Sequence, residues 1–372
     1  MKLKLKICLI VLVGMTAPST WAQAGCIGSS CSVIPFNQDS LNNLYFQFQY
    51  QYTNQLFEQI AKAGTMANIS GPPIGTVNLQ KFTVGGDVGA GYVPVTKRNI
   101  ALNGVGTFQD VPSGGAYAMP RVFAGVNLGY LTGSPYDPTE GGPTPSMLSL
   151  ARLDIYLQGV DARRRSHFDN GNGKLASGFY NRGIDVRYHL VEGSEILGGP
   201  LLRFLGVSLG WSYHVSRFDI RAQQFQRYKI ATFGGSQVFW DGYNYLYFDG
   251  RIRSTSAELA TGLQLLYFLN LSVGGGVSRN SGNAEFNLGR VGPVYGIGDL
   301  TSAALSASNV NFLSNAFNSY LYLNISGKGK VPRYLPYAKV GADINLWALK
   351  IFVEGLSGRH VFGANAGVRV QF

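Results

Sequence analysis

Apolar residues alternate with polar or very small residues in short segments along most of the chain. The clearest segment places Phe362, Ala364, Ala366, Val368, Val370 and Phe372 at every second position, with Gly363, Asn365, Gly367, Arg369 and Gln371 between them. Because successive side chains of a strand point to opposite faces, this pattern predicts a strand with one apolar and one polar wall. Such a strand fits a barrel that has lipid outside and water inside.

The same alternation recurs in segments long enough to cross a bilayer as strands. They are Lys81–Tyr92, Arg121–Leu131, Arg152–Val160, Gly183–Leu190, Leu205–Val215, Ala257–Leu265, Leu269–Val277, Tyr320–Ile325, Pro336–Leu346 and Trp347–Val353. An even strand number requires one more strand, for which Ala284–Gly289 is the best candidate, and 223–253 could hold two more or form a long external hairpin. The predicted fold is an all-β transmembrane barrel of 12–14 antiparallel strands over 76–372. A soluble β-sandwich would carry more than 14% charged residues.

The connections between these strands predict which end of the barrel faces the periplasm. The steps Leu266–Leu269 and Leu346–Trp347 leave room only for tight turns, which are typical of the periplasmic end. Longer connections, among them 161–173 and 278–284, are predicted to be external. The segment 290–317 is then expected to be a long periplasmic connection.

The first residues predict export through a cleaved signal peptide at 1–24. Lys2, Lys4 and Lys6 precede an apolar core, and Ala22-Gln23-Ala24 has the small-x-small pattern of a cleavage site. A lipoprotein attached through Cys26 is the alternative. Together with the barrel pattern, export predicts the outer membrane of a diderm (Gram-negative) bacterium. Cys26 and Cys31 are an even pair in an oxidising compartment and predict a small disulfide loop.

Residues 25–75 predict a plug or periplasmic segment rather than barrel. Helical spacing of apolar residues favours a helix from Ser40 to Ala63, ending near Gly64, although Tyr45–Tyr52 also alternates like a strand. A Gly/Pro-rich hinge, Asn68–Gly75, would lead into the first strand. The residues expected to form the plug are Leu44, Phe48, Tyr52, Leu56, Phe57 and Ile60.

Ionisable residues on the polar faces of the strands form the main candidate site, in the lumen. They are Lys81, Asp87, Arg121, Arg152, Asp154, Asp185, Arg187, His189, Glu258, Lys339, Asp343, Lys350, Glu354 and Arg369. Both signs occur, so they could pair and fill the lumen structurally, or line a polar path and hold a plug. A separate loop with Arg163, Arg164, Arg165 and His167 could bind anionic solutes or glycolipid phosphates, or simply be solvated.

The remaining motifs favour neither catalysis nor nucleic-acid binding. The segment Gly206–Gly210 matches Gly-x-Ser-x-Gly, but Ser208 lies inside an alternating strand instead of at a strand-to-helix turn, and His214 would lie about 20 Å away along it. No metal or cofactor motif is present. The net charge of +11 is spread along the chain without a basic helical stripe, so we expect no nucleic-acid partner.

These features resemble outer-membrane β-barrel proteins over 75–372. Phe372, preceded by Val370, Val368 and Ala366, resembles the C-terminal signal read by the barrel assembly machinery, which the resemblance implies as a partner. The candidate hatch Ser40–Ala63 with its hinge resembles the long-chain fatty-acid transporter family, fourteen-stranded barrels with a luminal hatch that carry hydrophobic compounds. The Asn-Pro-Ala triplet usual in that family is absent, so no ligand residues are implied.

The predicted function is a passive outer-membrane channel or transporter with an N-terminal plug, for hydrophobic or amphipathic small molecules. The plug segment and the aromatic stretch 239–248 motivate this prediction. A general porin for polar solutes, or a surface receptor or adhesin using the 223–253 loop, are the alternatives. An enzyme is not expected.

Overall fold

The protein is an antiparallel β-sheet rolled around an N-terminal helix, as described by a computed structural model. The structure describes residues 23–28, 38–71, 79, 81–133, 146–168, 172–197, 201–233, 236–297 and 319–372. Its strands are β1 (Gln23–Ile27), β2 (Phe82–Leu102), β3 (Gly106–Asn127), β4 (Leu153–Phe168), β5 (Gly173–Val191), β6 (Ser194–Leu197), β7 (Leu202–Phe233), β8 (Ser236–Leu265), β9 (Leu269–Ile297), β10 (Ser319–Lys330), β11 (Tyr334–Leu346), β12 (Leu349–Gly358) and β13 (Val361–Gln371). The predicted signal peptide, 1–24, lies almost entirely outside the described residues.

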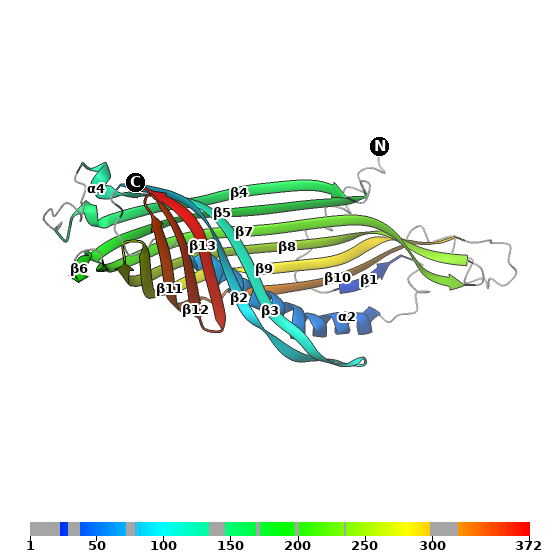
Figure 1. Cartoon of the computed structure of the whole chain (residues 1–372). Helices are drawn as coiled ribbons and strands as arrows, with labels where there is room; N and C mark the ends of the chain where they lie inside the picture. The colour runs from blue at the N-terminus through cyan, green and yellow to red at the C-terminus, as the bar shows by residue number, and fades with distance from the viewer. Residues whose placement is uncertain are drawn as a thin grey trace.

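The strands form a closed ring (Figure 1). Within the described residues, hydrogen bonding runs through β9, β11, β12, β13, β2, β3, β4, β5, β7 and β8 and returns to β9. β10 and β1 extend the sheet beside β9, and the short β6 pairs with β7. The all-β barrel is therefore confirmed. Its 13-stranded sheet falls within the predicted 12–14, although β1, β6 and β10 stand outside the ring.

Two tight turns, β8–β9 and β11–β12, lie at the end of the barrel where β13 ends. The Asn345 amide donates to the Phe268 carbonyl at 2.7 Å, which joins the β8–β9 turn to β11. The Gln371 amide donates to the Ala348 carbonyl at 2.8 Å, which joins the β11–β12 turn to β13. Both turns thus lie at one end, as predicted. Because such turns are typical of the periplasmic end of outer-membrane barrels, we expect this end to be periplasmic and the long hairpins of β4–β5 and β7–β8 to be external.

The strands extend far beyond the thickness of a bilayer at the external end. β8 has 30 residues, about 100 Å of strand, whereas a bilayer core is about 30 Å thick. β7 and β8 pair from Leu202–Leu265 to Phe233–Ser236, so 223–253 is a long external hairpin and adds no strand to the ring. Figure 1 shows this hairpin and β9 reaching away from α4 and the C-terminus.

Four predicted segments differ in the structure. β9 is continuous from Leu269 to Ile297, so 278–284 is no turn and Ala284–Gly289 is no separate strand. The reason is that β8 pairs with β9 over its whole length and holds it extended. The part of 290–317 up to Ile297 therefore belongs to β9, and residues 298–318 lie outside the described residues. The Arg163–Arg165 segment lies in β4 instead of in a loop.

One row of residues divides the barrel into two parts. Gln158, Gly183, His214, Ser254 and Asn280 pair in register across β4, β5, β7, β8 and β9. On the side of this row that leads to the β8–β9 turn, β3 pairs with β4, and β11 pairs with β9. We call this direction down. Above the row, β3 and β4 have no backbone pairing among the described residues, and β10 replaces β11 beside β9. We call the part below the row, which contains the β8–β9 and β11–β12 turns, the closed half. We call the part above the row the outer half.

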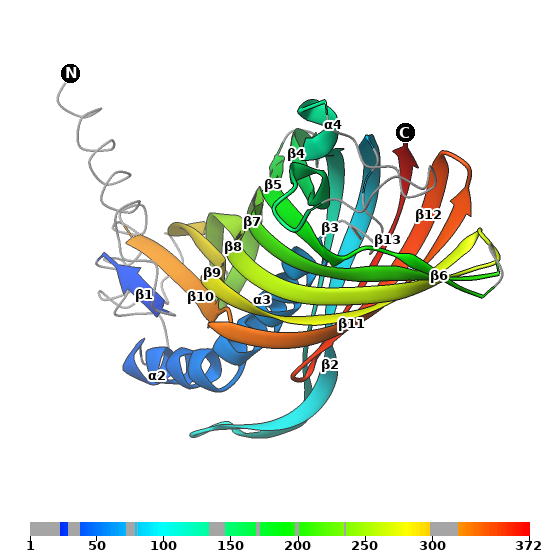
Figure 2. The ribbon, with the colours of Figure 1, turned by 90° about the vertical axis from the view of Figure 1, so that its left-hand side faces the viewer.

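The N-terminal helix runs from the outer half into the ring. It comprises α2 (Gln38–Phe48), a π-helical turn η2 (Gln49–Thr53) and α3 (Asn54–Ile69), and Figure 2 shows α3 inside the curve of the strands. None of the described helices is long and apolar enough to cross a membrane. Two short helices, α4 (Leu128–Leu131) and η3 (Leu150–Arg152), follow β3. The helical plug is confirmed, but its predicted end at Gly64 was wrong.

The helix does not end at Gly64, because this glycine lies where the helix packs closely against the barrel wall. A Cβ atom at this position would lie 2.5 Å from Cδ1 of Ile252 on β8. The absence of a side chain lets α3 approach the wall, and the helix continues to Ile69. β1 pairs with β10 in the outer half and therefore lies far from the β8–β9 and β11–β12 turns. A periplasmic segment would be expected near those turns instead.

Candidate functional site: the barrel lumen

All but one of the ionisable residues predicted to face the lumen are buried or half-buried. Asp87, Arg121, Arg152, Asp154, Asp185, Arg187, His189, Asp343, Glu354 and Arg369 are buried, and Glu258, Lys339 and Lys350 are half-buried. The exception is Lys81, which is exposed. Its placement in the lumen was wrong because it precedes β2 at the rim of the ring, where its side chain reaches solvent.

The buried charges of the closed half are paired between different strands, some of them adjacent and some separated by one strand. Arg121 on β3 contacts Asp87 on β2 at 2.6 Å, and Arg369 on β13 contacts Asp343 on β11 at 2.8 Å. A larger group connects four strands, β5, β8, β11 and β12, beyond these pairs. It joins Arg187, Glu258, Lys339 and Glu354 through Arg187–Glu258, Lys339–Glu258 at 2.8 Å and Lys339–Glu354 at 3.8 Å.

Because each of these buried charges has an opposite partner, the arrangement avoids the large penalty of an unpaired ion. Such pairs tie strands together across the lumen wall. They leave the interior of the closed half polar and filled with side chains.

Two buried histidines make carboxylate contacts, and one of them also holds the helix. His189 Nε2 lies 2.8 Å from Asp154 Oδ2. His214 Nε2 lies 2.9 Å from Asp185 Oδ1, and its Nδ1 lies 2.8 Å from the carbonyl oxygen of Asn68 in the last turn of α3. A carbonyl oxygen only accepts, so Nδ1 donates to it. The two contacts fasten the C-terminal end of α3 to the barrel wall.

Strand glycines form a seat for α3. A Cβ atom at Gly91 on β2 would lie 1.8 Å from the carbonyl oxygen of Ala63, and one at Gly115 on β3 would lie 2.4 Å from that of Gln59. On the opposite wall, a Cβ atom at Gly329 of β10 would lie 2.0 Å from the Phe57 carbonyl carbon. Any side chain at these positions would overlap the helix backbone. The wall is therefore shaped to the helix on both sides.

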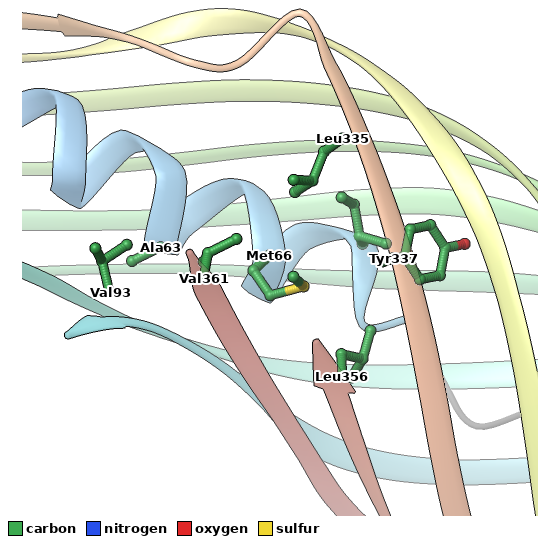
Figure 3. Close-up of a cluster of buried hydrophobic side chains, with 8 residues drawn as sticks. Ala63, Met66, Val93, Leu335, Tyr337, Leu356 and Val361 are labelled. Carbon is green, nitrogen blue, oxygen red and sulfur yellow. The ribbon is translucent and has the colours of Figure 1, made fainter. Parts of the chain in front are cut away.

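Apolar side chains complete the contact between helix and wall. Phe57 stacks on Phe286 of β9 at 4.9 Å between ring centroids and lies 6.0 Å from Phe248 of β8. Further along, Met66 packs among strand side chains (Figure 3). This cluster comprises Ala63, Met66, Ile69, Val93, Leu335, Tyr337, Leu356 and Val361. Burial of this surface stabilises the docked helix by the hydrophobic effect.

The predicted plug residues divide into two groups. Phe57 is buried, and Leu56 and Ile60 pack beside it against the wall. Leu44, Phe48 and Tyr52 are only half-buried, nearer the outer end. The deepest residues, from Ala61 to Ile69, were missed because the helix was expected to end at Gly64. The small residues at Ala61, Ala63 and Ala67 are the signal that could have revealed a close approach.

Gly71 and Leu79, which follow α3 in the sequence, contact the inner wall of the barrel. The Gly71 carbonyl accepts from Asn365 Nδ2 on β13 at 2.8 Å. The Leu79 amide donates to Asp154 Oδ2 at 3.1 Å, and the Leu79 side chain is buried with Tyr156. A cavity of about 20 Å³ remains beside Ser70, Gly71, Arg187 and Glu258, enough for about one water. The helix, Gly71, Leu79 and the ion pairs occupy the lumen at this level.

The other predicted site residues lie outside this assembly. Cys26 in β1 is disulfide-bonded, whereas its predicted partner Cys31 lies outside the described residues. Phe372 is exposed and stacks on Phe82 at 4.6 Å. Ser208 lies within β7, where its hydroxyl donates to the Ala260 carbonyl. Among the described residues, no group of three His, Cys, Asp or Glu side chains could hold a metal ion.

Solved structures with similar chains are outer-membrane barrels. The translocator domain of the autotransporter NalP from Neisseria meningitidis is 8% identical and has a TM-score of 0.29, over 83% of this chain and 94% of that one. The outer membrane protease OmpT from Escherichia coli is 10% identical, with a TM-score of 0.30 over 78% and 95%. A Pseudomonas aeruginosa FadL homologue is 10% identical, with a TM-score of 0.27 over 86% and 98%.

Sequence comparison gives the family of the chain directly. No curated protein matches it. The family model described as Lsa36-like matches residues 20–372, nearly the whole sequence. The chain belongs to the Lsa36-like family.

Proposed function

We propose that this outer-membrane β-barrel is a passive channel whose lumen is closed by α3. The observation that carries the proposal is the seat of the helix. Gly91, Gly115 and Gly329 each lie against the α3 backbone, with no room for a side chain. A wall shaped to one helix from two sides favours a docked plug. Displacement of α3 would remove the largest obstruction above the charged layer.

The substrate class that we propose is hydrophobic or amphipathic small molecules. Pairing of β3 with β4 spans only Phe123–Asn127 and Asp154–Gln158, so the wall has an unpaired seam directly above the closed half. An apolar molecule could leave the lumen through such a seam, just above the lipid-facing belt, without crossing the charged layer below. A general porin fits less well, because paired charges and the helix occupy the lumen. The aromatic residue Phe248 packs on Phe57 and is thus partly used to hold the helix.

Single-channel conductance of the refolded protein in planar bilayers tests the plug. Gly91→Val places a side chain where the Ala63 carbonyl lies and should push α3 from its seat. Gly86→Val on the same strand is the matched control, because a Cβ atom there has no contact closer than 3.4 Å. We expect small conductance in the native protein and in Gly86→Val, and a severalfold increase in Gly91→Val. Deletion of 38–69 should give the largest conductance.

Two outcomes would contradict the proposal. Equal and large conductance in all forms would make the protein an open porin. No conductance in any form, with folded protein verified by its heat-dependent gel mobility, would remove the channel function. Uptake of apolar and polar dyes into liposomes that contain Gly91→Val then tests the substrate class. Faster uptake of the polar dye would contradict the hydrophobic assignment.

A surface receptor or adhesin is the second candidate function. The observation in its favour is the length of the external hairpin, since β7 and β8 remain paired as far as Phe233 and Ser236. A channel alone does not require so long a projection. Removal of 223–246 should leave conductance unchanged and abolish binding to host or cell surfaces if this function holds. In either case we propose that the barrel assembly machinery and outer-membrane lipid are its partners, and that it has no enzymatic activity.

A further inference from the structure

The outer face of the barrel changes character just above its apolar belt. On β7 the exposed residues Leu209, Trp211 and Tyr213 face lipid, and Arg217 follows four residues later on the same face. On β8 the exposed Leu259 is followed on the same face by Arg253 and then by Arg251. Four residues of strand are about 13 Å. The arginines thus begin where the acyl region ends and the headgroups of the outer leaflet lie.

These arginines form one surface because the strands hold them in adjacent rows. Val215 pairs with Arg182 on one side and with Arg253 on the other. In the next row Arg217 pairs with Arg251. We define the arginine surface as Arg163, Arg165, Arg182, Arg217, Arg221, Arg251 and Arg253, on β4, β5, β7 and β8.

The surface has more positive charge than its own carboxylates neutralise. Asp161 contacts Arg163 at 3.4 Å, and Asp249 contacts Arg217 at 3.0 Å and Arg251 at 2.8 Å. Asp219 lies 3.9 Å from Arg217. In the described part of the chain, no carboxylate lies within 4.0 Å of the remaining arginines of the surface. These are Arg165, Arg182, Arg221 and Arg253.

Two of these arginines are held in position by aromatic rings. The guanidinium of Arg182 lies 4.9 Å from the centre of the Tyr180 ring, and that of Arg221 lies 5.3 Å from the centre of the Tyr247 ring. Stacking on a ring leaves the edge of the guanidinium free to donate hydrogen bonds. A groove of about 450 Å³ lies between the strands here, lined by Arg163, Arg165, Tyr180, Arg217 and Arg221.

We propose that the arginine surface binds the phosphate groups of a phosphorylated glycolipid in the outer leaflet of the membrane. Guanidinium groups bind phosphate with paired hydrogen bonds, and their number here exceeds that of nearby carboxylates. A lipid is favoured over a soluble phosphate because the apolar wall lies directly below. Acyl chains on Trp211 and Leu209 would bring a headgroup phosphate to the level of Arg217. The bound lipid would anchor the outer half at a fixed height.

Native mass spectrometry of the refolded full chain tests this proposal. The protein is titrated with bisphosphorylated lipid A, with dephosphorylated lipid A and with inorganic phosphate. The test variant is Arg165→Gln, Arg221→Gln, Arg253→Gln, which removes arginines that have no carboxylate partner. The matched control is Lys97→Gln, Lys229→Gln, Lys330→Gln. These lysines are exposed, lie off the surface and change the net charge equally.

We expect the native protein and the lysine control to bind the phosphorylated lipid far more tightly than the dephosphorylated one. The arginine variant should lose roughly 100-fold in affinity, since each surface cation contributes about tenfold or slightly less toward an anionic headgroup. Replacement of the same arginines by lysine should retain part of the affinity, which controls for misfolding. An equal loss in the lysine control, equal binding of both lipids, or saturation by inorganic phosphate alone would each overturn the proposal.

Discussion

The same strands run through the closed half and the outer half of the barrel, but the polarity of their two faces is reversed. Inward side chains are mainly polar in the closed half and mainly apolar in the outer half. On β8 of the closed half, Glu258 points inward to Arg187 and Lys339, while Leu259 is 51% exposed on the outside. In the outer half of the same strand, Ile252 is buried against α3 and Arg253 is exposed. No irregularity interrupts the pairing of β8 with β9 between these positions. The polarity of the inward and outward side chains is exchanged, whereas the strand continues without a break.

The difference follows from what surrounds each half. Lipid outside the closed half favours apolar outward residues, and the polar inward residues must then find partners within the protein. Water outside the outer half favours charged outward residues. The apolar inward residues there need an apolar partner, which α3 supplies through Phe57. The helix is therefore the core of the outer half, whereas the closed half combines paired charges with the apolar cluster around Met66.

The largest effect should come from breaking a buried pair in the closed half. Asp87→Asn leaves Arg121, whose side chain is fully buried, without its carboxylate. We expect a loss of about 3–5 kcal/mol in the free energy of unfolding, measured with urea in detergent micelles. The double variant Asp87→Leu, Arg121→Met removes both charges and should be near native stability. An equal loss in the double variant would show that the pair contributes net stability.

A slightly smaller effect should appear in the outer half, on the helix alone. Phe57→Ala removes the ring that packs between Phe248 and Phe286 and should weaken docking of α3 by about 3 kcal/mol. Hydrogen exchange of the α3 amides would then be faster, while unfolding of the barrel would be unchanged. Phe46→Ala on α2, where the ring is 45% exposed, is the control. Barrel unfolding that shifts as much as helix exchange would make the two halves one cooperative unit.

The sequence predicted the closed half well because the contrast between its faces is strong. Alternation in 362–372 and 336–346 matches β13 and β11, and the inward charges follow from the same pattern. It predicted the outer half poorly. Ile252 and Arg253 alternate in the same way, but which of them faces inward depends on whether lipid or water lies outside.

Features that depend on a distant partner could not be predicted at all. Gly91 and Gly329 read as ordinary strand glycines, since their role requires the position of α3. Gly64 read as a helix end for the same reason. The number of strands in the ring depends on which strand edges form backbone hydrogen bonds with each other. β9 is shared between β10 and β11, and alternation along one strand contains no information on that division.

A moderate effect should be confined to the boundary between the halves. His214→Gln removes the donor to the Asn68 carbonyl and should destabilise the last turn of α3 by about 1–2 kcal/mol. His189→Gln is the matched control, because His189 has a similar carboxylate contact with Asp154 and none to α3 among the contacts described. Hydrogen exchange near Asn68 should be faster only in His214→Gln. The same increase in both variants would mean that the lumen network, not the direct contact, holds the helix.

The smallest effect should lie at the tip of the outer half, beyond the helix. Arg227 contacts Asp241 with two nitrogens, each 2.8 Å from a carboxylate oxygen, and Tyr295 donates to the same carboxylate at 2.7 Å. The hydrogen bond from Arg227 lowers the pKa of Asp241 below its usual value. Because the pKa is lower in the folded state, the contact stabilises the hairpin above about pH 4 and is lost as the pH falls further.

Trp240, adjacent to Asp241 and buried, reports this change. With Trp21, Trp211 and Trp347 replaced by Phe, its emission should shift to the red as the pH falls below about 4 in otherwise native protein. Asp241→Asn should show the low-pH emission at every pH, because its side chain cannot ionise. A shift that persists in Asp241→Asn would assign the acid sensitivity to another carboxylate. Conductance should be unaffected throughout, since the tip lies above both the helix seat and the charged layer.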